Sequence, residues 1–319
     1  FPAAFMRHEV SELQAFPKQG SIEMDVGLVK RLSPGSLSVM EFKKDIDIKI
    51  AEKMLKHPLL GEEIPDKWNI ALKQGDFNMT SDSHLFKTEP GPGRLPLYEG
   101  KMIHQFDHKY AKPKYWIDEA EGRKAILGNI VDKKQKIGYE KYRIAYRSIA
   151  SNTNERSFIC TVIPPYFTGN SLHIAEIDDK SILLFNMVIF NSFTIDYFLR
   201  QKVTTNINMF YIYQLPIPRL TKKDPQFMPL VSRAARLICT TPEFDELASE
   251  VGLGSHKNGV TDPAERAKLR SELDGLVAHL YGVTREEFQH ILSTFPIVAQ
   301  EVRDAALRAY DDVAKGKIK

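Results

Sequence analysis

Basic and amide side chains are concentrated between residues 132 and 156. Seven cations stand here against the carboxylates of Asp132, Glu140 and Glu155, a local surplus of four positive charges; the cations are Lys133, Lys134, Lys136, Lys141, Arg143, Arg147 and Arg156. The whole chain of 319 residues carries a formal charge of only +3. Lysine and arginine neutralise phosphates, whereas arginine, asparagine and tyrosine bond to base edges. The stretch therefore predicts a surface that holds a polyanion in one register, with a solvated, charged loop as the alternative.

Candidate DNA contacts extend on both sides of this stretch. Arginine can pair with guanine, and asparagine with adenine, through two hydrogen bonds each. We expect phosphates to be bound by Lys133, Lys134, Lys136, Lys141 and Lys202, and base edges by Arg143, Arg147, Asn154, Arg156 and Asn206. The other predicted members of the DNA-binding set are Lys101, His104, His108, Tyr142, Arg200 and Thr204.

Two histidines in this set are spaced as metal ligands can be. His104 and His108 are four residues apart, so on a helix both imidazoles would share a face, which is one way to hold zinc. No third ligand follows at a spacing typical of zinc sites. A hydrogen-bonding or phosphate-contacting role is favoured, and no metal site is predicted.

Catalytic motifs are weak in this sequence. Glu41-Phe42-Lys43 has the Glu-x-Lys spacing of half a nuclease metal site, but this spacing is common by chance in charged chains. Ile163-Pro164-Pro165-Tyr166 mimics the Asn-Pro-Pro-Tyr signature of adenine-N6 methyltransferases, yet isoleucine cannot bond to the amine of a flipped adenine. No glycine-rich loop follows a strand to cradle S-adenosylmethionine. We predict no catalytic residue and no cofactor here; a nuclease or methyltransferase fragment and a protein-interaction scaffold are the alternatives.

The periodicities predict a mixed α/β chain in three parts. Residues 1–90 form a mixed segment with a helix near residues 45–57, and Pro90-Gly91-Pro92-Gly93 marks its end. Residues 91–220 form the recognition domain, and residues 221–319 are helical. Strands are expected at residues 139–146, 157–163 and 209–213, a buried helix at 182–199, and C-terminal helices that start at Asp262 and Thr284 and span residues 298–313.

Composition indicates a globular protein without an export signal. Hydrophobic residues make up 43% of the chain and charged residues 27%. Cys160 and Cys239 are too few for a disulfide framework, which fits a reducing cytoplasm. The polar residues Asn186, Asn191 and Asp196 argue against a membrane span at residues 182–199. The first residue is Phe1 rather than Met, which predicts a piece of a longer protein.

Ordered blocks of the sequence resemble a known family. LPLYEGKMIHQFDHKYA, YRSIASNTNERSFICTVIPP, LLFNMVIFNSFTIDYFLRQKV, FYIYQLPIP and ELDGLVAHLYGVTREEFQHILSTFP are similar, in this order, to the target-recognition region of bacterial type IIG-like adenine-N6 DNA methyltransferases. MEFKKDIDIKIAEKML and FNMTSDSHLFKT resemble the segment just before that region. The likeness spans nearly the whole chain.

The resemblance implies a module of a restriction-modification or phage-defence protein. Its partners would be double-stranded DNA and an upstream catalytic domain of the same parent chain, which would use S-adenosylmethionine. The resemblance leaves open whether the parent also cleaves DNA. The fold implied is that of type I specificity subunits, an α/β globule followed by helices. The catalytic Asn-Pro-Pro-Tyr and the methyl-donor motif of the family are missing here, so the resemblance assigns target selection rather than methyl transfer to this chain.

Overall fold

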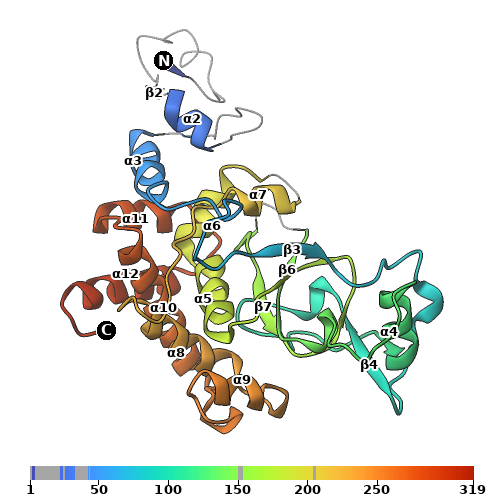
Figure 1. The fold of residues 1–319 in the computed structure, drawn as a ribbon. Coiled ribbons are helices and arrows are strands. Elements are labelled where there is room, and N and C mark those ends of the chain that lie inside the picture. Colours follow the sequence, from blue (N-terminus) through green and yellow to red (C-terminus); the bar gives the residue numbers. More distant parts are fainter. Residues whose placement is uncertain are drawn as a thin grey trace.

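Strands and helices occupy different sides of the molecule. The computed structural model describes residues 2–3, 22–23, 26–32, 42, 44–149, 154–203 and 206–319. In Figure 1 the strands gather on one side, and the C-terminal helices lie on the other. The predicted mixed α/β class with a helical C-terminal region is confirmed.

A four-stranded antiparallel sheet forms the centre of the strand side. Its order is β3 (Ala71–Gln74), β9 (Leu172–Glu176), β6 (Arg143–Arg147) and β7 (Cys160–Ile163). Strands were expected at residues 139–146 and 157–163, and β6 and β7 lie there. The alternation of polar and apolar residues predicts a half-buried strand, but the first four residues of β6 are buried, because β6 lies between β9 and β7.

A smaller mixed sheet lies beside the first. Its order is β5 (Tyr115–Asp118), β4 (Arg94–Tyr98) and β8 (Phe167–Thr168), with β4 and β8 parallel. Helix α4 (Glu119–Leu127) follows β5, and Gly122 lets it approach the ring of Phe167. Strand β3 comes from the segment expected to end at residue 90, yet it pairs with β9, so the sheet begins before the Pro-Gly punctuation.

The apolar run at residues 182–199 is two helices rather than the single helix predicted. Helix α5 (Lys180–Asn191) and helix α6 (Phe193–Arg200) meet at an angle of 59°. Ser192 causes the break, because its extended backbone ends α5 and its hydroxyl accepts a hydrogen bond from the amide of Ile195 to cap α6. Helix α5 packs on β7 and on α8.

Membrane-spanning potential is confined to this bent pair. Among the described residues, no single helix has both the length and the apolar character to cross a bilayer. The pair α5 and α6 meets those two criteria only when both helices are taken together.

The C-terminal helices start where capping residues predict. Helix α8 (Phe227–Ile238) and helix α9 (Asp245–Glu250) precede helix α10 (Pro263–Leu280), which Asp262 caps by accepting from the amide of Glu265. Thr284 and Glu287 form the predicted capping box of α11 (Arg285–Ser293). The last helix is α12 (Gln300–Ala314), as expected.

For one of the shorter elements the prediction from sequence was wrong. Residues 209–213 were expected to be a strand, but they form the helix α7 (Met209–Tyr213). The other elements are β1 (Pro2–Ala3), β2 (Ile22–Glu23), α2 (Val26–Leu32), α3 (Asp45–Met54) and the 3₁₀ turns η1 (Ser83–Leu85), η2 (Gly100–Met102), η3 (Gly138–Glu140), η4 (Pro242–Phe244) and η5 (His256–Asn258). Helix α3 is the helix predicted near residues 45–57.

Helices α10 and α12 approach so closely that they require a glycine. A Cβ atom at Gly275 would lie 2.8 Å from the backbone of Ala309 and Tyr310. On an open helix surface, Gly→Ala would stabilise by about 1 kcal/mol. Here we expect Gly275→Ala to lower the free energy of unfolding instead, by about 1–3 kcal/mol, because backbone must move. Urea unfolding measures this, with Ser271→Ala one turn earlier as the control; a stabilised Gly275→Ala would contradict the close approach.

Candidate nucleic-acid interface

An open hollow lies where strand β6 ends. Its volume is about 300 Å³, and its lining includes Gly100 and Lys101 of η2, Arg147 of β6 and Ser171 ahead of β9. Glu99 and Ile149, which is 71% exposed, complete the wall. The backbone amide of Gly100 donates to the hydroxyl of Ser171, which fixes η2 against the entry to β9. Residues far apart in the sequence thus meet around one cavity at the edge of the sheet.

An exposed aromatic ring lies beside the hollow. Tyr110 is 59% exposed and stacks on His104, with ring centroids 4.8 Å apart and an interplanar angle of 30°. The guanidinium carbon of Arg147 lies 5.9 Å from the centroid of the Tyr110 ring. We call Lys101, His104, Tyr110, Arg147, Ile149 and Ser171 the Tyr110 surface. It combines a flat aromatic face, a planar cation and a lysine.

Arg147 is held in a fixed orientation at this surface. Its Nε and Nη2 atoms both donate to the carbonyl oxygen of Ile103, at 3.1 and 2.6 Å. Among the described residues Nη1 has no hydrogen-bond partner. Partial burial lowers the pKa of the guanidinium, although arginine stays charged at neutral pH. A rigid, half-buried fork with a spare donor is suited to recognition, because little side-chain entropy is lost on binding.

His104 and His108 do not share a helical face. His104 lies in a tight turn, where its amide donates to the carbonyl of Asp107. Burial, followed by the charges of Arg270 and Arg147, lowers the pKa of His104, so its ring is neutral at pH 7. His108 is buried, its Nδ1 is 3.1 Å from the hydroxyl of Tyr98, and burial lowers its pKa to about 4. His104 can therefore support Tyr110, whereas His108 is a core residue.

Other exposed lysines accompany this surface. Lys101 is 54% exposed and lies 3.2 Å from Glu99, and Lys109 pairs with Glu243 at 2.9 Å. Lys112 and Lys114 are also exposed. The prediction from sequence missed Tyr110, Lys112 and Lys114. The signal that could have found them is the alternation of bases and aromatics in KYAKPKY, residues 109–115, which is typical of nucleic-acid contacts.

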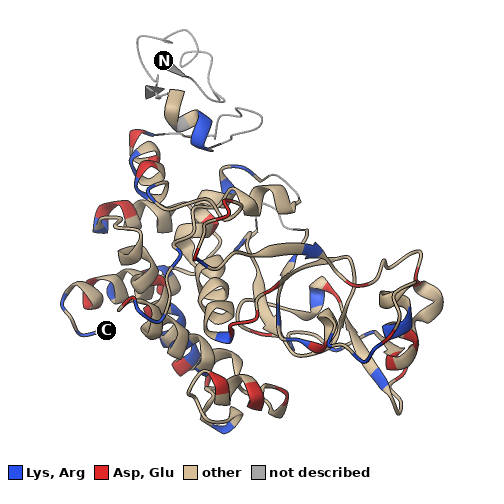
Figure 2. Ribbon diagram, viewed as in Figure 1, with Lys and Arg blue, Asp and Glu red and all other residues tan. Residues whose placement is uncertain are grey.

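The lysines between residues 132 and 136 lie on a different part of the protein. Lys133, Lys134 and Lys136 are exposed on the loop after α4. This loop is ordered by Asp132, which accepts two hydrogen bonds from Arg123, at 2.8 and 2.9 Å. Figure 2 shows basic and acidic residues interspersed around α4 rather than segregated. The expected basic stretch is thus exposed here, but it is separate from the Tyr110 surface.

The side chains of Arg143 and Arg156 are interior, contrary to what their sequence neighbourhood predicts. Arg143 is wholly buried and forms a two-pronged ion pair with Asp76, at 2.7 and 2.9 Å. Arg156 is 5% exposed and pairs with Asp196 at 2.8 Å. Neither guanidinium is presented to a DNA base in this conformation. We therefore leave both residues out of the proposed contact set.

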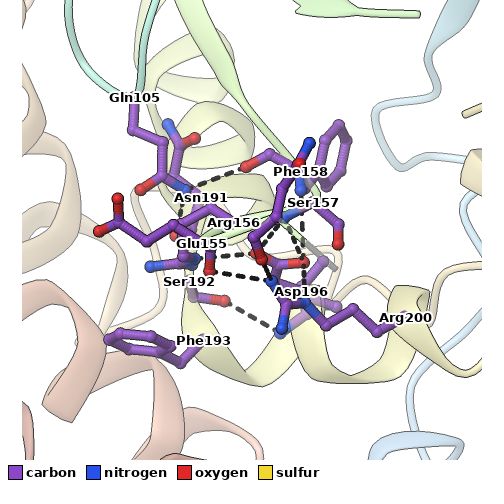
Figure 3. A network of polar contacts seen from close by, with 12 residues as sticks. Gln105, Glu155, Arg156, Ser157, Phe158, Asn191, Ser192, Phe193, Asp196 and Arg200 are labelled. Atoms are coloured by element: carbon purple, nitrogen blue, oxygen red, sulfur yellow. Dashed lines mark hydrogen bonds and ion pairs between the residues drawn. The ribbon is translucent and has the colours of Figure 1, made fainter. Parts of the chain in front are cut away.

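A buried polar network surrounds Asp196. Figure 3 shows its carboxylate facing Arg156, Arg200 and the backbone of Ser157 and Phe158. The Nε of Arg156 lies 2.8 Å away, the amide of Ser157 lies 3.0 Å away, and the Nε of Arg200 lies 3.6 Å away. This network fixes the start of β7 to α6.

The remaining predicted contacts divide between interior and surface. Lys202 donates to Gln214 at 2.7 Å, and burial lowers its pKa to about 7. The interior residues Tyr142 and Arg200 bond to backbone carbonyls, and Lys141 pairs with Asp178 at 3.0 Å. Asn154 and Asn206 are exposed, and Asn206 forms a β-bridge with Ile149 beside the hollow. Thr204 lies outside the described residues.

The two weak catalytic motifs gain no support as catalytic sites. Glu41 and Lys43 lie outside the described residues. Tyr166 stacks on Tyr98 with ring centroids 5.8 Å apart, and its carbonyl accepts from Arg143 at 2.6 Å, so it packs between the sheets. Within the described part of the chain, no three His, Cys, Asp or Glu side chains are grouped as metal ligands.

Comparison with known proteins gives a likeness in structure and none in sequence. No protein-family model matches the sequence, and no curated protein is similar to it. A solved structure of the type IIL restriction-modification enzyme MmeI in complex with DNA is similar to this chain, with a TM-score of 0.42 and 14% sequence identity. The likeness covers 78% of this chain and 37% of the MmeI chain, so this chain spans little more than a third of that protein's length.

Proposed function

We propose that this chain binds double-stranded DNA through the Tyr110 surface and selects a target sequence for a methyltransferase domain of its parent protein. The observation that supports the proposal is that Lys101 and Arg147 line one open hollow, and that the ring of Tyr110 lies 5.9 Å from the guanidinium carbon of Arg147. Direct readout needs a donor fork held in one orientation, and phosphate binding needs a mobile cation nearby. Arg147 and Lys101 match these two roles.

The proposed DNA contacts involve residues of the Tyr110 surface and their neighbours. Arg147 donates to the acceptors of a guanine through the part of its fork that Ile103 leaves free. The exposed amide of Asn206, which borders Ile149, suits adenine. Tyr110 offers an apolar face to a base or sugar, and Lys101 and Lys112 meet phosphates. Lys133, Lys134 and Lys136 add sequence-independent contacts on the loop after α4.

The chemistry of the parent is part of the same proposal. The ordered sequence blocks resemble target-recognition regions of adenine-N6 methyltransferases, and this resemblance supports the proposal that an upstream domain binds S-adenosylmethionine and transfers the methyl group. In this division of labour, the present chain positions the DNA, and bond-making takes place elsewhere.

The decisive experiment is selection of bound duplexes from a random-sequence DNA pool, followed by titration of the selected duplex against a scrambled one. We expect enrichment of one sequence and an affinity that falls steeply with salt, because phosphate contacts release counterions. An affinity without salt dependence, or a pool that stays random, would argue against the proposal.

Replacing Arg147 with lysine should remove discrimination while leaving general binding in place. Arg147→Lys keeps the charge but loses the planar fork, so the preference for the selected duplex should fall by about 1–3 kcal/mol. Binding to the scrambled duplex should change little. Fluorescence anisotropy with both duplexes measures the two affinities.

Two control variants distinguish the loss of base reading from a general loss of DNA binding. Lys133→Ala should weaken both duplexes equally and reduce the salt slope by about 1, because it removes a phosphate contact. Arg285→Gln removes an exposed cation of α11, paired with Asp311 at 2.7 Å and far from the Tyr110 surface in sequence, and should leave binding unchanged. Equal losses on both duplexes for Arg147→Lys would rule out base reading by this residue.

A further inference from the structure

A second cavity lies between helices α10 and α12, outside the Tyr110 surface. Its volume is about 500 Å³, which is within the range of small-molecule sites. Phe193 of α6, Val302, Ala305 and Ala309 of α12, and Ile318 provide apolar walls. Figure 1 shows α10 and α12 side by side near the C-terminus. Charged and polar groups make up most of the remaining lining, and we call Arg156, Arg270 and Asp274 among them the charged end.

Arg270 is a partly buried cation at this cavity with few hydrogen bonds, whereas the lining cations Lys268 and Arg308 are exposed. Among the described residues, its only hydrogen bond goes from Nη2 to the side-chain oxygen of Gln105, at 3.2 Å. Guanidinium has five N–H donors, so most of its capacity is unused. Burial, and then the nearby charge of Arg156, lowers the pKa of Arg270. A partly buried cation whose one hydrogen bond in the described residues goes to a neutral amide can accept an anion that would use its remaining donors.

Arg156 and Asp274 complete the charged end. Both line this cavity, and together with Arg270 they also line an enclosed void of about 10 Å³ on the inner side. Asp274 accepts from the amide of Phe193 at 2.9 Å, and burial raises its pKa to about 6. Near this pKa the carboxyl group is partly protonated and can donate to a ligand oxygen.

We propose that the cavity between α10 and α12 binds a small amphipathic organic anion, whose carboxylate, sulfonate or phosphate pairs with Arg270 and whose apolar body lies against Phe193 and α12. The charged end supplies orientation and the walls supply buried apolar area, which is the usual division in small-molecule sites. The proposal is independent of DNA binding by the Tyr110 surface.

The charges at the cavity favour a small anion over DNA. Glu155, Glu272, Glu301 and Asp312 also line it, beside the exposed cations Lys268 and Arg308. Of these, Glu272 is neutralised by Arg233 at 2.7 Å and Asp312 by Lys317 at 3.2 Å, whereas Glu155 and Glu301 have no ion-pair partner in the described residues. A duplex carries phosphates along its whole length and would meet these carboxylates. A ligand with one anionic head can avoid them.

Binding should depend on the protonation of Asp274. This carboxyl faces Arg270 on its own helix, Arg156 ahead of β7 and Asp196 of α6. Its ionised form repels an anion, and its protonated form does not. The affinity for an anion should therefore rise as the pH falls through about 6, and Asp274→Asn, which stays neutral, should remove this dependence.

The test uses 8-anilinonaphthalene-1-sulfonate, a fluorescent amphipathic anion, with uncharged N-phenyl-1-naphthylamine as its matched control. We expect the sulfonate to bind one site per chain at least about tenfold more tightly than the neutral probe, equivalent to about 1.4 kcal/mol. Decanoate should displace it. Arg270→Met removes the cation, and Ala305→Leu fills the cavity while leaving Arg270 in place; each should abolish this binding. Arg285→Gln on α11 should have no effect.

Two results would overturn the proposal. One is unchanged probe binding in Ala305→Leu, since that would place the probe elsewhere. The other is displacement by a DNA duplex but not by decanoate, since that would assign the cavity to the nucleic acid. DNA binding by the Tyr110 surface can fail or succeed without changing either readout.

Discussion

Asp196→Asn should lower the free energy of unfolding by about 3–5 kcal/mol, because it removes one partner of a buried ion pair and leaves the other without a counter-charge. Asp196 is wholly buried and accepts from the Nε of Arg156 and from the amides of Ser157 and Phe158. Asparagine has the same shape as aspartate, but an NH₂ group replaces one of the two carboxylate oxygens. That donor would face the donors of Arg156 or of the backbone.

Equilibrium unfolding in urea measures this loss. The matched control is Asp311→Asn, which breaks the more exposed pair with Arg285 at 2.7 Å and should change stability little, since exposed pairs contribute little. Equal midpoints for the two variants would mean that the Asp196 network does not stabilise the fold. An Arg156→Ala variant that loses DNA binding should show the same instability, because Arg156 acts through Asp196.

Local signals in the sequence predicted the C-terminal helices well. The Asp262 cap and the Thr284–Glu287 capping box each join residues that are three apart in the sequence. The interaction that starts each helix can therefore be predicted from the local sequence. The strand predicted at residues 209–213 was wrong. The prediction depended on aromatic and β-branched residues, which favour strands. In the fold, the hydroxyl of Tyr213 instead accepts a hydrogen bond from the amide of Leu72, and a short helix places it there.

The candidate site was harder to predict because its charges have distant partners. A high density of cations between residues 132 and 156 indicated an exposed patch. However, Arg143 pairs with Asp76, 67 residues earlier, and Arg156 pairs with Asp196, 40 residues later. Nothing local distinguishes these arginines from Arg147, whose partner is a backbone carbonyl. Whether an arginine is buried or exposed here depends on its position in the folded sheets.

The position of β6 in the sheet explains the contrast between Arg143 and Arg147. Both residues belong to this strand, at opposite ends. Arg143 points into the region between the two sheets, whereas Arg147 is at the end of the strand, beside the hollow. One strand thus carries a structural arginine and a recognition candidate. Substitution of Arg143 should therefore change the stability of the fold, whereas substitution of Arg147 should change DNA binding.

Asp76→Ala should destabilise the protein by about 3–5 kcal/mol, because it leaves the guanidinium of Arg143 buried and uncompensated. Arg143 is on the antiparallel sheet, and Asp76 in turn accepts from the amide and the hydroxyl of Thr168 on β8, at 2.9 and 2.7 Å. The pair therefore joins the two sheets. Arg143→Met should cost a similar amount, because the carboxylate of Asp76 then loses its cation.

The double variant Arg143→Met with Asp76→Ala is the informative measurement. If the two side chains act as a unit, the double variant is no less stable than either single variant, since it leaves no buried charge behind. Additive losses would show instead that each residue stabilises the fold separately. In the double variant, selective binding of the chosen duplex should return wherever the fold returns, because Arg147 is untouched. Loss of selectivity in a stably folded double variant would assign DNA recognition to the pair and not to the Tyr110 surface.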